Sequence, residues 1–585
     1  MKKINSTPQY NRKDKPNIFS LLKSYRGIIV LLVFFTLVGN GANLVIPQII
    51  SRGIDSFTNE NYVLKKVIIE FSAATLIIFL FSFLQQIVQT FASERVAFDL
   101  RKQLSDKISR QSYAFIQKSN PARLLTNLTS DMDSVKMFVS MAVTTIISST
   151  IVIIGACALL ISINWKLALA VIGMIPVMMA VFYVVLKKVR VLFKRSREVI
   201  DWLNKVINES ILGAAIIRVL NSQQLEYQKF LKANTEAKDV GIGILNLFAT
   251  LIPIITFVSN IAILAVLAMG GHFVILGNLS LGEFAAFNSY ITILIFPIIM
   301  IGFMSNVIAQ ASASYERIHR VLNATETKDT GTVTEPLKGY LELKDISVIY
   351  DGKPALNSVS FTIKEGSRTA IIGPTAAGKS QLLYLLTGLI KPDEGQVLFD
   401  NIPLSEFNKE QFYNQVGFVF QDSIMFNLSL RENIAFNDQV TDESLEKAIQ
   451  TAELTEFIQS LPDGLDTLVS ERGTSLSGGQ KQRIMLARAL ALNPKILLLD
   501  DFTARVDQQT EQKILCNVMS NYPELTLISV TQKIAPVKHF EQIILLMESE
   551  VIATGKHEEL MKTCPEYIQI HNSQLSTSHY ELQSK

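Results

Sequence analysis

The chain has 585 residues, of which 49% are hydrophobic and only 18% are charged, and its formal net charge is +3. A chain of this length exceeds one compact domain, and its low charged fraction requires that a large part of it lies outside water. The small net charge gives no indication of a nucleic acid or an acidic ligand as partner. The three cysteines stand far apart without a CxxC pair or metal-ligand spacing, so we expect reduced, unpaired thiols.

The first 310 positions contain apolar stretches long enough to cross a bilayer, which takes about 20 residues. Residues 1–25 before them are polar and basic and lack the early apolar core of a removable signal peptide. A soluble core could also contain long apolar helices, but not so many of this length. We therefore predict a multidomain membrane protein with an all-α transmembrane domain over residues 26–322. Its six predicted spans are about 27–50, 67–92, 138–162, 165–187, 247–270 and 281–305.

Lysine and arginine residues indicate which ends of the spans face the cytoplasm. They cluster in the amino-terminal segment and in the long connections after the second and fourth spans. The turns after the first, third and fifth spans are short and poorer in basic residues. Because basic connections stay on the cytoplasmic side, we expect a multi-pass protein of the cell (plasma) membrane with both termini in the cytoplasm.

The two long connections, residues 93–137 and 188–246, keep helical periodicity with charged faces and few glycines. We therefore expect the membrane helices to continue far into the cytosol. Each connection has one break, at Ser119–Pro121 and at Leu212–Ala215, where the chain turns and presents a tip.

The second half of the chain differs in composition. Residues 323–339 are polar and poor in helix formers, which is typical of a linker. Residues 340–585 alternate short β-rich runs, such as 396–400 and 416–420, with helical patterns. This alternation predicts an α/β domain.

A phosphate-binding loop is the most specific motif of this domain. Residues 373–380 read GPTAAGKS and fit G-x-x-x-x-G-K-[ST] between a β-rich run and a helical one. Backbone N–H groups of such a loop surround the phosphates of ATP, Lys379 adds charge, and the Ser380 hydroxyl can ligate Mg²⁺. The predicted nucleotide-binding residues here are Gly373, Pro374, Thr375, Ala376, Ala377, Gly378, Lys379, Ser380 and Gln381.

Two further motifs follow the loop. Residues 496–500, ILLLD, have the pattern of a buried strand that ends in a carboxylate, and Asp500 would hold Mg²⁺ directly or through water. Between the two lies LSGGQ, whose Ser-Gly-Gly turn offers free N–H groups and the positive end of a helix dipole to an anion. An ordinary capped helix would have the same sequence pattern. The residues of this motif are Leu476, Ser477, Gly478, Gly479 and Gln480.

Taken in order, these motifs resemble an ATP-binding cassette (ABC) transporter of the exporter type, with membrane spans fused ahead of one P-loop ATPase cassette. Further similar positions are Tyr350, Gln421 within Val-Phe-Gln-Asp-Ser, and Asp507. The resemblance extends over nearly the whole chain. Similar segments outside the nucleotide motifs are Pro121–Asp131 at the first cytoplasmic tip, Glu316–Ile318 at the end of the membrane half, and Glu471–Gly473 before the signature.

The resemblance implies a role for each matching residue. Tyr350 stacks on adenine, Gln421 touches Mg²⁺ and senses the membrane helices, and Asp507 belongs to the D-loop. LSGGQ closes over ATP bound to a partner cassette, because these domains work as head-to-tail pairs. The tips near residues 117–124 and 209–217 are the coupling helices that rest on the cassettes.

Two residues depart from the family pattern at the groups that act on the γ-phosphate and its water. Asp501 stands where the family usually has Glu, and misplacing a catalytic group by about 1 Å can cost on the order of 10²-fold in rate. Gln532 stands where the family usually has His; it can donate a hydrogen bond but cannot carry the charge of an imidazolium. Each change alone could be neutral, but together they predict a site that binds ATP and hydrolyses it slowly. Smaller departures are Ala376, Gln381, Ser470 and Arg505.

We therefore predict one half of an ATP-driven exporter, an ABC-type translocase, in which a heterodimer is favoured over a homodimer. Catalysis would occur at the composite site formed by this chain's LSGGQ and the Walker motifs of a second half-transporter. Met300, Met304, Phe296 and Phe303 give the sixth span a soft apolar surface, which fits a hydrophobic or amphipathic, drug- or lipid-like substrate, although lipid-facing packing explains it equally well. The alternatives are a homodimeric lipid flippase and a regulatory membrane subunit that uses ATP as a ligand to gate another protein.

Overall fold

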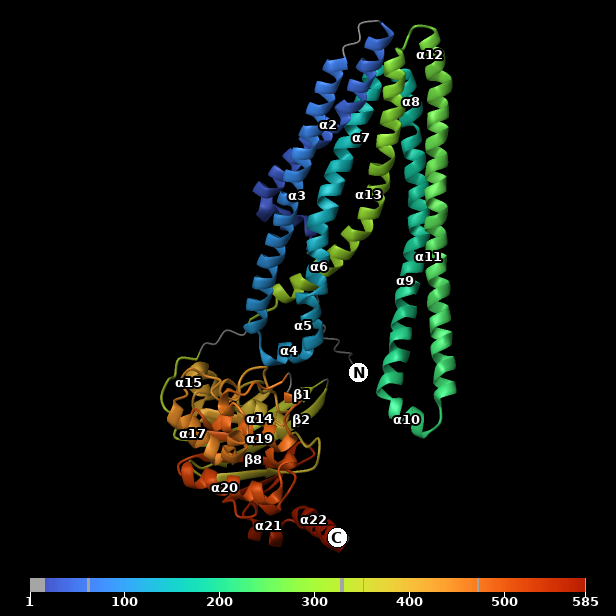
Figure 1. Cartoon of the computed structure of the whole chain (residues 1–585). Coiled ribbons are helices and arrows are strands. Elements are labelled where there is room, and N and C mark those ends of the chain that lie inside the picture. The colour runs from blue at the N-terminus through green and yellow to red at the C-terminus, as the bar shows by residue number, and fades with distance from the viewer. Residues whose placement is uncertain (1–15, 60–63, 327–330, 351, 471–472, 584–585) are drawn as a thin grey trace. The chain divides into compact units, whose positions relative to one another are not determined.

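The computed structural model describes residues 16–59, 64–326, 331–350, 352–470 and 473–583 (Figure 1). The chain divides into two compact units. The first consists of Met1–Arg110 and Ser119–Thr325, and the second of Gln111–Lys118 and Glu326–Lys585. The boundary after Thr325 lies inside the segment expected to be a linker, and the second unit also includes Gln111–Lys118, which leads into the first predicted cytoplasmic tip.

The first unit is built of helices, and among the described residues six of them are long and apolar enough to cross a membrane. These six are Ile18–Thr58, Leu64–Ser109, Pro121–Ile163, Trp165–Leu212, Pro253–Ile275 and Leu281–Leu322. Each overlaps one predicted span, so the prediction of a six-helix membrane domain is confirmed. Most are about twice as long as a bilayer requires, because they continue as the polar helical extensions that the sequence indicates.

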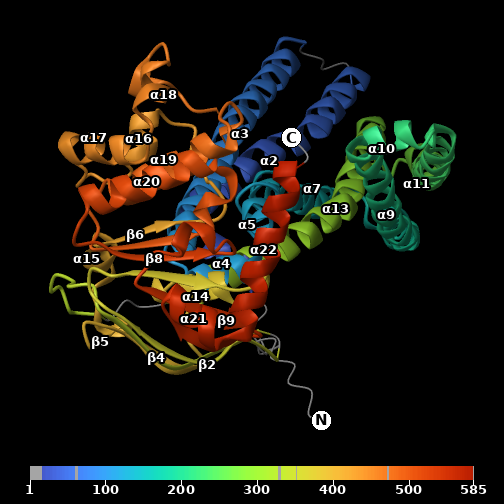
Figure 2. The same ribbon diagram turned by 90° about the horizontal axis from the view of Figure 1, so that it is seen from below.

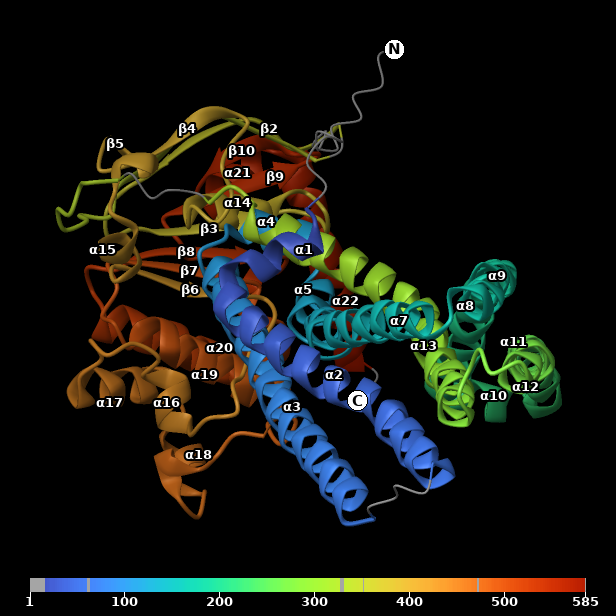
Figure 3. The ribbon, with the colours of Figure 1, turned by 90° about the horizontal axis from the view of Figure 1, so that it is seen from above.

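In chain order, the helices of this unit are α1 (Ile18–Leu21), α2 (Arg26–Thr58), α3 (Leu64–Ser109), α5 (Pro121–Leu128), α6 (Ser130–Met137), α7 (Thr144–Ile163), α8 (Trp165–Ile172), α9 (Met174–Leu212), α10 (Ala214–Val219), α11 (Gln223–Ala265), α12 (Gly271–Ile275) and α13 (Leu281–Leu322). α2 packs along α3 and α9 along α11, while α13 contacts α2, α6 and α7 (Figures 1 and 3).

The predicted helix breaks occur where the backbone cannot continue a helix. Asn120 has a φ of 61°, and its side chain accepts a hydrogen bond from the Ala122 N–H at 3.0 Å, which starts α5 with Pro121 in its first turn. α9 ends at Leu212 and α10 begins at Ala214, so Gly213 separates the two helices.

Polar contacts secure the two ends of α13. At its start, the Asp55 carboxylate accepts hydrogen bonds from the Ser280 hydroxyl at 2.7 Å and from the Gly282 N–H at 2.8 Å. Near its end, Arg317 forms a paired hydrogen bond with the Asp131 carboxylate of α6. The helix that leads into the second unit is therefore held at both ends.

The second unit has two sheets. A four-stranded antiparallel sheet has the order β2-β1-β4-β5, and a six-stranded, mostly parallel sheet has the order β10-β9-β3-β8-β7-β6. The strands are β1 (Leu341–Tyr350), β2 (Lys353–Ile363), β3 (Arg368–Ile372), β4 (Glu394–Phe399), β5 (Ile402–Pro403), β6 (Val416–Val419), β7 (Ile496–Asp500), β8 (Thr526–Thr531), β9 (Gln542–Met547) and β10 (Glu550–Gly555). The predicted α/β domain is thus confirmed.

Helices cover the six-stranded sheet on both faces (Figure 2). α14 lies between the two sheets, and α17, α19 and α20 pack on the other face. The helices are α4 (Tyr113–Ser119), α14 (Lys379–Leu386), α15 (Lys409–Tyr413), α16 (Leu430–Ile434), α17 (Asp442–Thr451), α18 (Thr455–Gln459), α19 (Gly478–Leu490), α20 (Gln508–Asn521), α21 (His557–Thr563) and α22 (Pro565–Gln583).

The alternation of side chains along the central strands explains this layering. Leu497 and Leu499 of β7 belong to the apolar core with α19, whereas Ile496 and Leu498 belong to the core with α14. A strand that is apolar on both faces must be covered on both, as in other parallel sheets. On the side of α14, the segment Gln111–Lys118 joins the unit through Tyr113, whose ring centre lies 5.4 Å from that of Tyr384.

Candidate functional site

The parallel strands gather the motifs at one edge of the six-stranded sheet. β3, β8 and β7 are neighbours, so their carboxyl ends meet where ligands bind in open α/β sheets. The phosphate loop follows β3, Gln532 follows β8, and Asp500 ends β7. Residues far apart in the sequence are thereby brought together.

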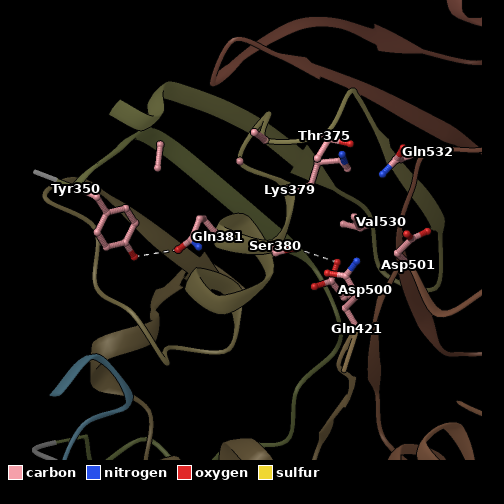
Figure 4. Close-up of a pocket in the computed structure, with 13 residues that line it drawn as sticks. Tyr350, Thr375, Lys379, Ser380, Gln381, Gln421, Asp500, Asp501, Val530 and Gln532 are labelled. Carbon is pink, nitrogen blue, oxygen red and sulfur yellow. Dashed lines mark hydrogen bonds between the residues drawn. The ribbon is translucent and has the colours of Figure 1, made fainter. Parts of the chain in front are cut away.

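Most predicted nucleotide-binding residues line one cleft at this edge, with a volume of about 290 Å³ (Figure 4). Gly373, Pro374 and Ala377 belong to the same loop without lining the cleft. The lining residues are Tyr350, Ala355, Thr375, Ala376, Gly378, Lys379, Ser380, Gln381, Gln421, Asp500, Asp501, Val530 and Gln532.

Two glycines let the loop backbone pack closely against neighbouring strands. A Cβ atom added at Gly373 would lie 2.0 Å from the carbonyl oxygen of Leu546 in β9, and one at Gly378 would lie 2.3 Å from that of Ala355 in β2. Gly378 also has a φ of 96°, in the left-handed region that favours glycine. No other residue could take either place without moving the strand beside it.

Lys379 folds back onto the loop. Its Nζ donates hydrogen bonds to the carbonyl oxygens of Gly373 at 2.8 Å and Pro374 at 2.7 Å. Burial lowers the pKa of the Lys379 ammonium, while the nearby carboxylates of Asp501 and Asp500 act in the opposite direction. An ammonium that is held by neutral carbonyls can exchange one of them for a phosphate oxygen, because the phosphate acceptor also carries a negative charge and therefore attracts the ammonium more strongly.

Two residues of the loop region, Ala376 and Gln381, differ from the family pattern. Ala376 has a φ of 67°, a conformation that suits glycine better than alanine. The Gln381 Oε1 accepts a hydrogen bond from the Tyr350 hydroxyl at 2.9 Å, shown as a dashed line in Figure 4. Gln381 therefore ties the Tyr350 ring to the start of α14.

Asp500 has a free carboxylate oxygen beside Ser380. The Ser380 hydroxyl donates to Asp500 Oδ1 at 3.2 Å, whereas Oδ2 is buried and has no hydrogen-bond partner among the described residues. Burial raises the pKa of Asp500, and the hydrogen bond from Ser380 counteracts this shift. A buried carboxylate oxygen next to a hydroxyl offers the hard oxygen ligands that Mg²⁺ prefers, so these residues fit that ion.

Both departures from the family pattern face this cleft. Asp501 has a φ of 44°, and its N–H donates to the Val530 carbonyl of β8 at 2.9 Å, so the starting point of its side chain is fixed. Gln532 comes directly after β8, and Figure 4 shows it on the same side of the cleft as Lys379 and Asp501. The site thus combines a complete phosphate cradle with a short carboxylate and a neutral amide.

The chain is similar to ABC transporters over most of its length. Residues 29–298 match the family model described as ABC transporter transmembrane region, and residues 356–504 match the one described as ABC transporter. The uncharacterized ABC transporter ATP-binding protein YfiB of Bacillus subtilis (strain 168) is 33% identical over 486 residues, which are 82% of this chain and 84% of that protein. The chain belongs to the ABC transporter family.

Two more similarities also extend over most of the chain. The ATP-dependent lipid A-core flippase of Syntrophus aciditrophicus (strain SB) is 28% identical over 497 residues, which are 84% of this chain and 83% of that protein. The fold matches the solved structure of a bacterial Atm1-family ABC exporter with ATP bound, with a TM-score of 0.78 and 23% identity over 94% of this chain and 99% of that one. The predicted exporter-type half-transporter, with one ATP-binding cassette, is confirmed.

In this ABC transporter the signature residues lie at the start of α19. The Ser477 Oγ accepts from the Gln480 N–H at 3.2 Å, and Gln480 Oε1 accepts from the Ser477 N–H at 2.8 Å, which caps the helix. A Cβ atom added at Gly478 would lie 3.1 Å from Cδ of Arg505, and one at Gly479 would lie 3.0 Å from its carbonyl oxygen. The unexpected D-loop arginine therefore packs directly on the glycine turn of the signature.

The neighbouring motif residues have local structural partners. Asp507 Oδ1 accepts from the Thr510 N–H at 2.9 Å and caps α20. The Ser470 Oγ accepts from the Ser475 N–H at 3.0 Å and closes the loop before the signature. Residues 471–472 of that loop lie outside the described part of the chain.

Sequence reasoning missed three residues around the cleft. Ala355 and Val530 line it, but they carry no polar group and no motif marks them. Gln574 of α22 donates a hydrogen bond to the carbonyl oxygen of Gln532, although nothing in the sequence around Gln574 distinguishes it from any other polar helix residue. The first two could have been found only from the sheet register, and the third only from the tertiary structure.

Proposed function

We propose that this chain is one half of an ATP-driven exporter of hydrophobic or amphipathic compounds, and that it pairs with a different half-transporter in the cell membrane. The proposal rests on the residues that line the cleft. The groups that would hold ATP are complete, while Asp501 and Gln532 replace the two groups that act on the γ-phosphate and its water. The distribution of lysine and arginine supports cytoplasmic termini and a cytoplasmic cassette.

ATP binding would use the loop and both ends of the cleft. Tyr350 is 48% exposed and its hydroxyl is held by Gln381, so its ring can stack on adenine. The loop N–H groups and the N-terminus of α14 face the phosphates, and Lys379 can turn from its two carbonyl partners to a phosphate oxygen. Ser380, Gln421 and Asp500 would hold Mg²⁺, which neutralises charge on the β- and γ-phosphates when bound.

Hydrolysis at this cleft should be slow for a geometric reason. A general base must lie within hydrogen-bond reach of the water that it activates. The Asp501 backbone is fixed by its bond to Val530, so it cannot advance by the length of the missing methylene without disturbing the β7–β8 pairing. Gln532 can donate a hydrogen bond to a phosphate oxygen but adds no positive charge.

Surfaces of both halves of the chain support a second chain as partner. The signature turn at Ser477–Gln480 is intact, and it would complete the ATP site of a partner cassette. In the membrane unit, the tip around α10 carries apolar side chains that are strongly exposed, with Leu212 at 79%, Val219 at 84% and Leu220 at 67%. Such a cluster at a helical tip is typical of a protein contact, and a partner cassette would cover it.

The substrate class rests on the sixth span and on one relative. Phe296 is exposed, Met300 and Phe303 are half-buried, and Met304 is buried, so only the first three could line a substrate path. The relative from Syntrophus aciditrophicus is named as a lipid A-core flippase, which supports a lipid-like or amphipathic substrate. Soft apolar side chains accept varied hydrophobic molecules.

The test compares the full chain alone with the full chain in vesicles that also contain a half-transporter with Glu at the position of Asp501. We expect the solitary chain to bind ATP and to hydrolyse it about 10²-fold more slowly than the pair. Ser477→Trp in this chain should abolish the activity of the pair, because it blocks the partner's site. Fast hydrolysis by a homodimer of this chain would contradict the proposal and support the homodimeric lipid flippase. ATPase activity of the pair without vectorial transport would support the regulatory subunit.

Asp501→Glu provides a prediction at the same site. The longer side chain restores the carboxylate position, so ATP hydrolysis by the solitary chain should rise, by at most about 10²-fold and less than that while Gln532 remains. Steady-state phosphate release measures the change. The matched control Asp501→Asn keeps the short side chain without its charge and should give no gain. Equal rates for Glu and Asn would show that side-chain length is not the cause.

A further inference from the structure

The C-terminal helix α22 contacts the loop that carries Gln532. Gln574 Nε2 donates a hydrogen bond to the Gln532 carbonyl oxygen at 2.6 Å, and the Ile534 N–H donates to Gln574 Oε1 at 3.0 Å. One side-chain amide therefore bonds to the backbone on both sides of Lys533. None of the motifs described above includes Gln574.

α22 gives this amide a fixed base. Tyr567 is fully buried and Cys564 is 4% exposed, and both belong to the same apolar core as Ile534, which is 1% exposed. Gln574 follows Tyr567 by about two helical turns, so both side chains lie on one face of α22. The beginning of the helix packs against α21, as Figure 2 shows. The amide thus reaches the loop from an anchored element.

Holding the loop backbone constrains the point from which the Gln532 side chain starts. Gln532 follows the last residue of β8 and lines the cleft with Lys379 and Asp501. The carbonyl carbon and the Cβ atom of Gln532 are both bonded to its Cα atom, and the peptide bond between Gln532 and Lys533 is planar. Holding that carbonyl and the Ile534 N–H therefore restricts the direction of the Cα–Cβ bond, from which the Gln532 side chain extends into the cleft.

We propose that Gln574 is a positioning residue of the nucleotide site, which directs Gln532 towards the place of the γ-phosphate. This inference rests on the proposed ATP-binding function and deepens it. Because only ATP has the phosphate that Gln532 would contact, the C-terminal helix becomes a determinant of how the cleft distinguishes ATP from ADP.

The test uses the full chain in nanodiscs and measures the affinities for ATP and ADP separately by calorimetry in the presence of Mg²⁺. Gln574→Ala removes both hydrogen bonds, and Gln574→Glu keeps an acceptor for Ile534 but loses the donor to Gln532. Asn572→Ala, an exposed position of the same helix, is the matched control. Losing one ordinary hydrogen bond corresponds to about fivefold in affinity. We expect both Gln574 variants to bind ATP about three- to tenfold more weakly, with ADP affinity unchanged, and Asn572→Ala to match the wild type.

A double variant distinguishes positioning from a general structural role. In a Gln532→Ala background, Gln574→Ala should have no further effect on ATP affinity, because it acts through the side chain that is already absent. A parallel loss of ATP and ADP affinity, or a full additional loss in that background, would overturn the inference. If the wild type prefers ATP and Gln574→Ala does not change this preference, the inference alone fails. If the wild type binds neither nucleotide, the proposed function fails with it.

Discussion

Ala376 adopts a backbone conformation in the phosphate loop that an L-residue occupies at a cost. Its φ is 67°, and the left-handed region costs a non-glycine residue about 1–2 kcal/mol. We predict that Ala376→Gly raises the free energy of unfolding of the cassette by about 1 kcal/mol, since glycine removes the strain but loses more entropy on folding. Thermal unfolding of the full chain, followed by its apparent Tm, measures the effect.

The residue that follows Ala376 supplies the control. Ala377 does not have a positive φ, and it is 3% exposed in the core beside α14. Ala377→Gly should therefore lower the apparent Tm, because it removes a buried methyl group and raises the conformational entropy of the unfolded chain. A gain of stability at both positions would mean that loop flexibility, rather than the left-handed conformation of Ala376, determines the result.

Among the elements, α6 and α13 are joined by one ion pair. The Arg317 Nε donates to Asp131 Oδ2 at 2.9 Å; the Asp131 side chain is 5% exposed and that of Arg317 is 35% exposed. Arg317→Ala leaves the Asp131 charge buried without its partner, and we expect it to reduce the stability of the membrane unit by about 2–3 kcal/mol. The apparent Tm of the detergent-solubilised chain measures this loss.

Two further variants identify the buried charge as the cause of that loss. Arg320→Ala removes an exposed arginine of the same helix, whose Nε makes a hydrogen bond of 3.4 Å to the Glu316 carbonyl, and it should have little effect. The double variant Asp131→Asn with Arg317→Met should be more stable than Arg317→Ala alone, because no charge stays unpaired. A double variant that is less stable than the single one would contradict this explanation.

The packing of α22 should depend on pH through His557. Its Nδ1 lies 2.8 Å from the Tyr567 hydroxyl, and burial, followed by neighbouring His571, lowers the pKa of His557 below its ordinary value of 6.5. The folded state therefore favours the neutral ring, so its stabilising contribution is present above pH 6.5 and is lost as the pH falls towards the folded-state pKa. The titratable groups that act on His557 are His571, Lys538, His539 and Glu558, of which only Glu558 raises the pKa of His557.

Hydrogen exchange of the α22 amides measures this dependence. We expect their protection, corrected for the intrinsic exchange rate, to fall as the pH is lowered from about 7 to about 5. His557→Gln keeps a polar group next to Tyr567 but does not titrate, and it should remove most of the change. The amides of the buried strand β7, which has no such histidine contact, serve as the internal reference. An equal loss in β7 would indicate global unfolding instead.

At the scale of the whole molecule, the sequence predicts features that depend on local pattern and misses features that depend on tertiary contact. Apolar length alone indicates the six spans, and the spacing of GPTAAGKS together with a buried strand ending at Asp500 indicates the cassette. Parallel strand order also explains why Asp501 and Gln532 meet the phosphate loop. The hydrogen bond between Tyr350 and Gln381 and the contact of Gln574 with the Gln532 carbonyl join segments that are distant in the sequence, and no sequence pattern marks either contact.

The exposed tip around α10 provides the last prediction, which concerns assembly. Val219 is 84% exposed, and the proposed function places this tip on the cassette of a second chain. Val219→Glu would bury an unpaired charge in that contact, so we expect ATP-driven transport by the pair to fall roughly tenfold or more, while ATP binding by this chain is unchanged. Transport in paired vesicles and nucleotide binding are measured on the same preparation. Ile275→Glu is the matched control, because Ile275 is 85% exposed but lies in α12, beyond the opposite end of α11. If both variants lose transport equally, the cause is a charge at any exposed apolar position. If the tip transmits movement between two chains, only Val219→Glu loses transport.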